Sequence, residues 1–161
     1  TLEALMDLPE KPRTVLALDG VTNPQNVGMI IRSAVAAGVD GLLYPKRGIA
    51  SLGPLVIKAS AGNVFRAPII RCDATVSAVA ALRAKGYEVA TLEASGETSL
   101  FEFKAVDSVV CVLGGESDGI GREVAALADN RLTIPMANGV ESLNVAVTAA
   151  LVSFRLGQTP D

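Results

Sequence analysis

The sequence predicts an α/β protein with a mostly parallel β-sheet and helices on both of its faces. Half of the 161 residues are hydrophobic and 19% are charged, which is typical of a compact domain with a real core. Short apolar runs that favour strands alternate along the chain with longer stretches that favour helices. A glycine follows most of the helical stretches, at the position where a left-handed residue ends a helix.

Each expected element follows from this alternation. The expected strands are Thr14–Asp19, Gly41–Tyr44, Pro68–Arg71, Glu88–Leu92, Ser108–Leu113 and Arg131–Ile134. The expected helices are Asn26–Ala37, Pro54–Ser60, Thr75–Lys85, Gly121–Ala128 and Leu143–Arg155. Thr1–Arg13 has no sustained periodicity, so we expect a linker or the remnant of an N-terminal domain, followed by one domain over residues 14–158.

Residue usage excludes several functions. Histidine is absent, which removes the commonest general base and metal ligand, and with them Ser-His-Asp hydrolysis and most zinc chemistry. Cys72 and Cys111 lie in apolar runs, so we expect two buried thiols in preference to a disulfide or metal pair. No apolar run approaches the roughly 18 residues of a membrane span and the start does not resemble a signal peptide, so a cytoplasmic location is the default expectation.

The charge is distributed unevenly. The whole chain carries −3, but the stretch from Gly20 to Cys72 has six basic residues and one acid, a net charge of +5. This asymmetry permits a polyanionic partner such as RNA, although ordinary solvated surface charge is the simpler explanation on composition alone. If the partner is RNA, the residues that we expect to contact it are Arg32, Lys46, Arg47, Lys58 and Arg66.

Three polar segments follow expected strands, at the sheet edge where open α/β proteins bind their ligands. The first runs from Asp19 to Gly28 and enters a helix that carries Arg32. Asn26 can cap this helix, which is a structural role. Arg32 lies among apolar residues, and since a buried guanidinium without a partner is costly, we expect it to reach one.

The second segment, Leu113–Gly121, is a glycine-rich turn between an expected strand and an expected helix. Glycines let a ligand approach the backbone closely and present its N–H groups, although a plain turn could use the same residues. The turn is not a P-loop, because no Gly-Lys-Ser/Thr follows. It is not a dinucleotide fingerprint either, because that motif follows the first strand.

The third segment, Ile134–Val147, is a strand end, a polar turn and an apolar helix. Ser142 and Asn144 straddle the expected helix start, so capping explains at least one of them. An asparagine at the position of Asn144 is uncommon unless its side chain has a specific partner.

Together the three segments resemble the three motifs of the SpoU (TrmH-like) branch of the SPOUT superfamily. Asn26 and Arg32 carry the first motif, Gly-Gly-Glu-x-x-Gly-Ile at 114–120 the second, and Ile-Pro-Met…Ser-Leu-Asn-Val at 134–145 the third. The resemblance covers roughly residues 15–156. One departure is Gly115, where many relatives have alanine, and we expect it to leave the chemistry unaffected.

This resemblance implies a C-terminal trefoil knot, which sequence periodicity could not reveal. It also implies a homodimer in which the first-motif helix and the last helix pack across the interface. The implied cofactor is S-adenosylmethionine (SAM). The implied SAM contacts are Leu92, Glu93, Ala94, Gly114, Glu116, Ile134, Met136 and Leu143.

The implied activity is transfer of a methyl group from SAM to a ribose 2′-hydroxyl of ribosomal or transfer RNA, without a metal. A guanidinium stays protonated near neutral pH, so we expect Arg32 to bind the adjacent phosphate and polarise the 2′-oxygen, with base action left open. A knotted module that binds SAM or RNA without methyl transfer is the alternative. The implied catalytic residues are Arg32, Asn26, Glu116, Ser142 and Asn144.

Overall fold

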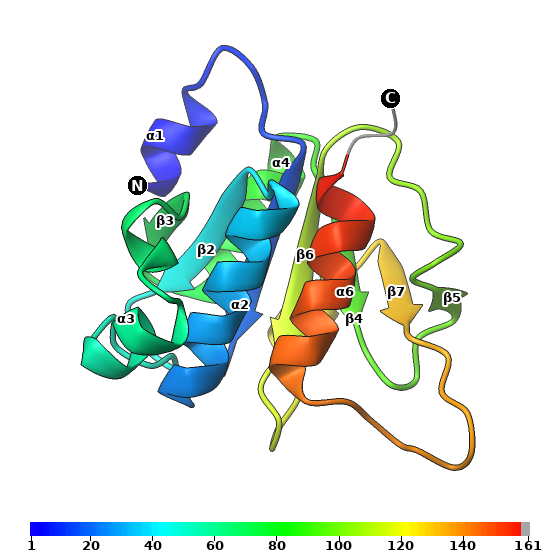
Figure 1. Cartoon of the computed structure of the whole chain (residues 1–161). Helices are drawn as coiled ribbons and strands as arrows, with labels where there is room; N and C mark the ends of the chain where they lie inside the picture. The colour runs from blue at the N-terminus through cyan, green and yellow to red at the C-terminus, as the bar shows by residue number, and fades with distance from the viewer. Residues whose placement is uncertain (159–161) are drawn as a thin grey trace.

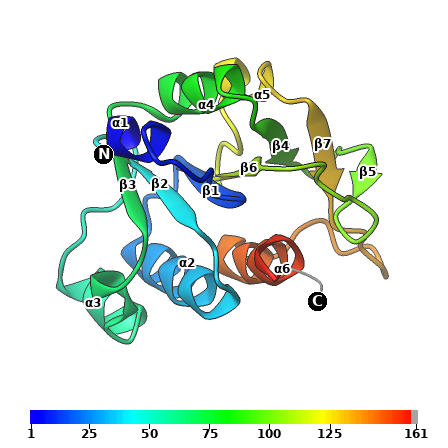
Figure 2. The ribbon, with the colours of Figure 1, turned by 90° about the horizontal axis from the view of Figure 1, so that it is seen from above.

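The computed structural model describes residues 1–158, which form one β-sheet with helices against both faces (Figures 1 and 2). The strands are β1 (Thr14–Asp19), β2 (Gly41–Pro45), β3 (Ile69–Cys72), β4 (Glu88–Leu92), β5 (Thr98–Ser99), β6 (Val109–Gly114) and β7 (Asn130–Thr133). The helices are α1 (Leu2–Met6), α2 (Pro24–Ala37), α3 (Pro54–Ala59), α4 (Thr75–Ala84), α5 (Arg122–Ala125) and α6 (Val145–Gly157), with a 3-10 turn η1 (Asn63–Phe65).

The sheet has the strand order β3-β2-β1-β6-β4-β7-β5, and every pair of neighbours is parallel. The central pair, β1 and β6, runs in register from Thr14 opposite Val109 to Asp19 opposite Gly114. In a parallel sheet all strands end at the same edge, so the segments that follow β1, β4, β6 and β7 emerge together. The expected mostly parallel sheet is confirmed.

Helices α2, α3 and α6 cover one face of the sheet, and α1, α4 and α5 cover the other (Figure 2). Alternate residues of β1 enter the two cores: Leu16 and Leu18 face the α2 side, and Val15 and Ala17 the α4 side. A strand buried on both faces shows a continuous apolar run, which explains why β1 could be located from sequence.

The helices that follow the first and third polar segments begin at asparagine caps. The side chain of Asn23 accepts hydrogen bonds at the start of α2, with Pro24 as the first helical residue. The expectation that Asn26 caps this helix is therefore wrong, since Asn23 already fills that position and the Asn26 side chain can contact another segment. Asn144 caps α6, which begins at Val145, two residues later than expected.

The segment expected to be a linker contains a short helix. In α1 the side chains of Leu2, Leu5 and Met6 pack against the core on the α4 side, because their spacing places them on one helical face. Two other elements also differ from expectation. The two-residue strand β5 has no sequence signal, and α5 has four residues where a longer helix was expected.

The start of β1 lies beside the end of α6. Thr14 Oγ1 donates to the carbonyl of Leu156 at 2.9 Å. Asp40 Oδ2 accepts from the backbone N–H groups of both Arg13 and Thr14, each at 2.9 Å. The first contact joins the start of β1 to the last turn of α6, and the contacts of Asp40 join it to the loop between α2 and β2.

The two cysteines are free and buried, as expected. Burial raises the pKa of the Cys111 thiol to about 12, so this thiol is protonated and unreactive at neutral pH. Among residues 1–158, no helix is both long enough and apolar enough to cross a bilayer.

Candidate functional site

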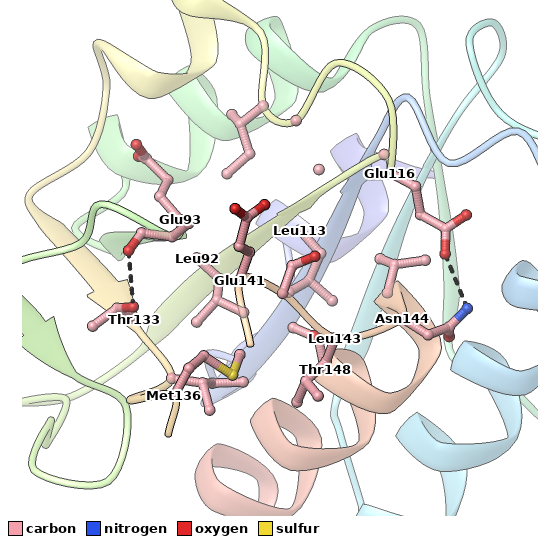
Figure 3. A pocket seen from close by; sticks show the side chains of 18 of the residues that line it. Leu92, Glu93, Leu113, Glu116, Thr133, Met136, Glu141, Leu143, Asn144 and Thr148 are labelled. Carbon is pink, nitrogen blue, oxygen red and sulfur yellow. Dashed lines mark hydrogen bonds between the residues drawn. The ribbon is translucent and has the colours of Figure 1, made fainter. Parts of the chain in front are cut away.

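A pocket of about 840 Å³ opens over the carboxyl ends of β4, β6 and β7, three neighbours in the sheet. Its walls are the segments that follow these strands and the first turn of α6 (Figure 3). The position agrees with the rule that open parallel sheets bind ligands outside their carboxyl ends. The volume is within the roughly 300–1,000 Å³ of small-ligand sites.

The side chain of Asn144 joins all three polar segments. Its Nδ2 donates to Glu116 Oε1 at 2.9 Å (Figure 3) and to Asn26 Oδ1 at 3.2 Å. Its Oδ1 accepts from the N–H of Ala146 at 2.8 Å, so the same side chain caps α6. The prediction that Asn144 has a specific partner is confirmed. The bonds connect residues 28 and 118 positions away in the chain, so the site forms only when all three segments are in place.

Two adjacent glycines let the turn after β6 fold tightly. A Cβ on Gly114 would lie 2.3 Å from the carbonyl carbon of Gly119, within the same turn. A Cβ on Gly115 would lie 2.2 Å from the carbonyl oxygen of Gly20, in the loop after β1. Both distances are far shorter than the contacts that real Cβ atoms make. An alanine at position 115 therefore requires the Gly20 backbone to move.

The pocket lining is acidic. It contains Glu93, Glu116 and Glu141 and, among the described residues, no lysine or arginine. Glu93 is neutralised from outside the lining by Arg131, with Nη2 and Oε2 2.6 Å apart. Hydrogen bonds from Arg131 and from Thr91 hold the pKa of the Glu93 carboxyl below its ordinary value of 4.5. The Glu141 side chain points into the middle of the pocket (Figure 3), which therefore favours a ligand with a cationic group.

The residues predicted from sequence to bind the cofactor all line this pocket: Leu92, Glu93, Ala94, Gly114, Glu116, Ile134, Met136 and Leu143. Three of the predicted catalytic residues, Glu116, Ser142 and Asn144, also line it. Asn26 is buried behind the lining and reaches the site through Asn144.

Arg32 is exposed on α2 and does not line the pocket. The interpretation of Arg32 as a buried charge is wrong. The buried stripe of α2 repeats every three to four residues through Val27, Ile30, Ile31 and Ala34, and position 32 falls outside it.

Sequence reasoning missed several lining residues, most clearly Thr133, Glu141 and Thr148. Thr133 precedes Ile134 in the third motif, and its Oγ1 donates to the carbonyl of Ala94 at 3.3 Å. Thr148 lies one helical turn after Asn144, so the helical repeat could have identified it. Glu141 had no distinguishing local signal.

The residues predicted to contact RNA fall in separate places. Lys46 and Arg47 line a second cavity of about 830 Å³ near the ends of β1 and β2, where Lys46 pairs with Asp73 at 2.5 Å. Lys58 on α3 and Arg66 after η1 are exposed and line neither cavity.

A parallel sheet with a glycine-rich turn and a ligand-sized pocket at its carboxyl edge defines an α/β protein that binds a small ligand at the sheet edge. Residues 13–154 match the model of the SpoU rRNA Methylase family, and the chain belongs to this family. The chain is 38% identical over 143 residues to a TrmH family tRNA/rRNA methyltransferase of Staphylococcus aureus, a match that covers 89% of this chain. The same match covers 58% of the staphylococcal protein, so the chain spans little more than half the length of this relative.

Solved structures show the same fold. An AdoMet-bound rRNA methyltransferase from Sinorhizobium meliloti superposes with a TM-score of 0.84 at 31% identity, covering 94% of this chain and 59% of that one. A structure described as giving insight into the 2-OH methylation of C/U34 on tRNA superposes with a TM-score of 0.78 at 29% identity, covering 90% of this chain and 94% of that one.

Proposed function

We propose that this chain transfers the methyl group of SAM to a ribose 2′-hydroxyl of ribosomal or transfer RNA. The observation that carries the proposal is the Asn144 side chain, which joins the three motifs beside an acidic pocket of cofactor size. Support comes from the S. meliloti structure, which holds AdoMet, and from the structure described in terms of 2-OH methylation on tRNA.

SAM binds, in this proposal, in the pocket over β4, β6 and β7. Its sulfonium and ammonium groups are cations, and the Glu116 and Glu141 carboxylates of the lining complement them. The tight turn at Gly114 and Gly115 brings backbone groups close to the cofactor. The trefoil knot belongs to the same proposal. The segments that would form it, 113–121 and 134–144, are those that supply most of the lining.

The reaction is a direct displacement. The 2′-oxygen forms a bond to the methyl carbon, the bond from that carbon to sulfur breaks, and its electron pair leaves on sulfur as a neutral thioether. The hydroxyl proton leaves with the RNA phosphate or solvent as acceptor. The protein's contribution is alignment and activation of a weak nucleophile. Arg32 binds the adjacent phosphate and polarises the 2′-oxygen, which needs no deprotonated guanidinium.

Arg32 reaches the reaction from a second copy of the chain. On α2 the exposed positions Gln25, Met29, Arg32 and Ala36 repeat every three to four residues and form one outward stripe. Helix α6 packs beside α2 (Figure 2) and exposes Val147 and Phe154, 50% and 45% accessible, while Met29 on α2 is 41% accessible. A homodimer through this face covers these apolar side chains and carries Arg32 toward the partner's pocket.

Two substitutions test the mechanism. Arg32→Ala should bind SAM normally, because Arg32 lies outside the pocket, but should lose about 10²–10³ in methyl transfer, as when one preorganised contact is removed. Arg32→Lys keeps the positive charge but lacks the planar guanidinium with its paired donors. A rate of methyl transfer close to wild type would indicate that Arg32 binds a phosphate, and an inactive variant would indicate a directional contact with the 2′-oxygen. Calorimetry measures SAM binding, and labelled SAM with unmodified RNA measures transfer.

Mixed dimers test whether the site is shared. Arg32→Ala and Glu116→Ala chains are each inactive alone, but a heterodimer has one site with both defects and one with neither. Mixing them should restore about a quarter of wild-type activity at random assortment of a two-fold dimer. No restoration would contradict the shared site. SAM binding by the wild-type chain without any transfer would instead favour the alternative of a binding module.

A further inference from the structure

Phe65 is the most exposed aromatic side chain of the protein, with 79% of its surface accessible. It lies at the end of η1, a turn that packs against α2 and α3. A single exposed apolar residue is common on protein surfaces, so exposure alone does not identify a site. Whether Phe65 forms part of a binding site depends on the residues around it.

An ordered backbone holds the ring in solvent. The carbonyl of Gly62 accepts from the N–H of Phe65 at 3.2 Å. Ser60 is fully buried, and its Oγ donates to the carbonyl of Ile57 at 3.0 Å and accepts from the N–H of Val64 at 3.3 Å. Val64, the residue before Phe65, packs against the core. The exposure of Phe65 is therefore built into a fixed turn and is not the result of a loose loop.

The surface around the ring is cationic. Helix α3 packs against η1, and residues 54–66, which span both, carry two basic side chains and no acid. Lys58 on α3 and Arg66 directly after Phe65 are both exposed, and neither forms an ion pair within residues 1–158. Leu55 on α3 is 57% accessible and adds apolar surface. A rigid aromatic ring bordered by basic side chains is complementary to a base face with its flanking phosphates.

We propose that Phe65 is a stacking platform for an unpaired base of single-stranded RNA, with Lys58 and Arg66 on the flanking phosphates. The inference rests on the proposed function in taking RNA as the partner. It adds that the part of the RNA recognised here is an unpaired base, and that this base binds at Phe65. The basic residues are also those that their charge pattern marks as RNA contacts, whereas the aromatic ring has no sequence signal of its own.

A second copy of the chain fits this surface poorly. In a two-fold dimer the same patch meets itself, so two surfaces that each carry Lys58 and Arg66 would face each other, and like charges across an interface are unfavourable. The exposed apolar side chains of α2 and α6 offer a face with fewer charges for chain–chain contact. RNA, in contrast, has the opposite charge and aromatic bases.

A single tryptophan can report stacking directly, because the chain contains none. The Phe65→Trp chain is titrated with an unstructured oligoribonucleotide of about 12 nucleotides, a length typical of single-strand sites. We expect saturable quenching of the indole emission. Heparin, which binds through charge but has no bases, should leave the emission nearly unchanged. Phe101→Trp is the matched control, since Phe101 is 52% accessible but precedes the acidic Glu102, and it should show no quenching.

Affinity provides the second measurement. Phe65→Ala should weaken oligoribonucleotide binding by about 5- to 150-fold, the range expected for one stacked base. Phe65→Tyr should retain binding, and Phe65→Leu, which is apolar without an aromatic face, should not. SAM affinity and the mass in light scattering should be unchanged in all three variants.

Three results would overturn the proposal: unquenched emission from Phe65→Trp bound to RNA, equal affinity of Phe65→Ala and wild type, or no binding of RNA by the wild-type chain. A lower oligomeric mass for Phe65→Ala would also overturn it, because the patch would then be a contact between chains. Failure of the wild-type chain to bind SAM would refute the proposed function separately and leave this surface in place.

Discussion

Replacing Asn144 separates two roles of one side chain. In the wild type its Oδ1 caps α6 and its Nδ2 bridges Asn26 and Glu116. Asn144→Ala removes both. The lost cap costs about 1 kcal/mol. The oxygen of Asn26, a residue only 6% accessible, loses its donor, at about 1–3 kcal/mol. Glu116 is exposed, so water replaces the lost hydrogen bond to its carboxylate and the cost in stability there is small. The free energy of unfolding should therefore fall by roughly 2–4 kcal/mol.

Asn144→Asp keeps the cap and removes the bridge. A carboxylate accepts from the backbone and gains about 0.3–1 kcal/mol at a helix N-terminus. It cannot donate, and it places a second negative charge beside Glu116. We therefore expect a smaller loss of stability than for alanine, but an equal loss of SAM affinity, since the turn after β6 is repelled. Adding Glu116→Gln supplies a donor to the new carboxylate and should recover part of the SAM affinity.

Urea unfolding measures the stability of each variant, and calorimetry measures its affinity for SAM. A double-mutant cycle of Asn144→Ala with Asn26→Ala should show a coupling of about 0.5–3 kcal/mol, because the two side chains are in contact. SAM affinity of Asn144→Asp within twofold of wild type would refute the reasoning, since the bridge would then have no part in shaping the pocket.

Two further outcomes are expected from the structure. Gly114→Ala should destabilise the chain by about 1–3 kcal/mol and abolish SAM binding, as measured by urea unfolding and calorimetry, because its Cβ would lie 2.3 Å from Gly119. Gly53→Ala, with its nearest neighbouring atom 3.8 Å away, is the control and should be close to neutral. Asp129 Oδ1 accepts a hydrogen bond from Arg83 at 2.7 Å, and this bond lowers the pKa of the Asp129 carboxyl from 3.8. The stabilisation that the ionised carboxyl gives to the fold is therefore full above pH 3.8 and is lost as the pH falls through the lowered pKa. Asp129→Asn should thus be about 1 kcal/mol less stable at pH 7 and equal to wild type in strong acid, and an equal difference at both pH values would contradict the assignment.

Elements with a strong internal pattern could be predicted from the sequence. The bounds of β1 were predicted to the residue, because burial on both faces demands a continuous apolar run. The start of α2 was placed wrongly because Asn23 and Asn26 are equally good caps, and only Pro24 at the first helical position favours Asn23. Strand β5 is two residues long and has no period to detect.

The candidate site was predicted in part, and the limits have physical causes. The predicted lining residues followed from the resemblance to the SpoU branch, which the three motifs carry. The ion pair between Glu93 and Arg131 joins positions 38 apart and has no local signal. The outward position of Arg32 depends on which stripe of α2 faces the sheet, and the surrounding apolar residues concealed that stripe. The exposure of Phe65 depends on the turn that precedes it.

The hydrogen bond from Thr14 to Leu156 places the two ends of residues 14–156 within one side chain's reach of each other. The order of elements along the chain is therefore separable from their order in space. A short peptide could join residue 158 to residue 13, and new ends could be opened at Val106, which is 95% accessible. Such a circular permutant would be synthesised with β6 first and β5 last. Two of the three strands under the pocket, β6 and β7, would then leave the ribosome before β1, and the third, β4, would follow it. The segments of the site would therefore meet in a different order during folding.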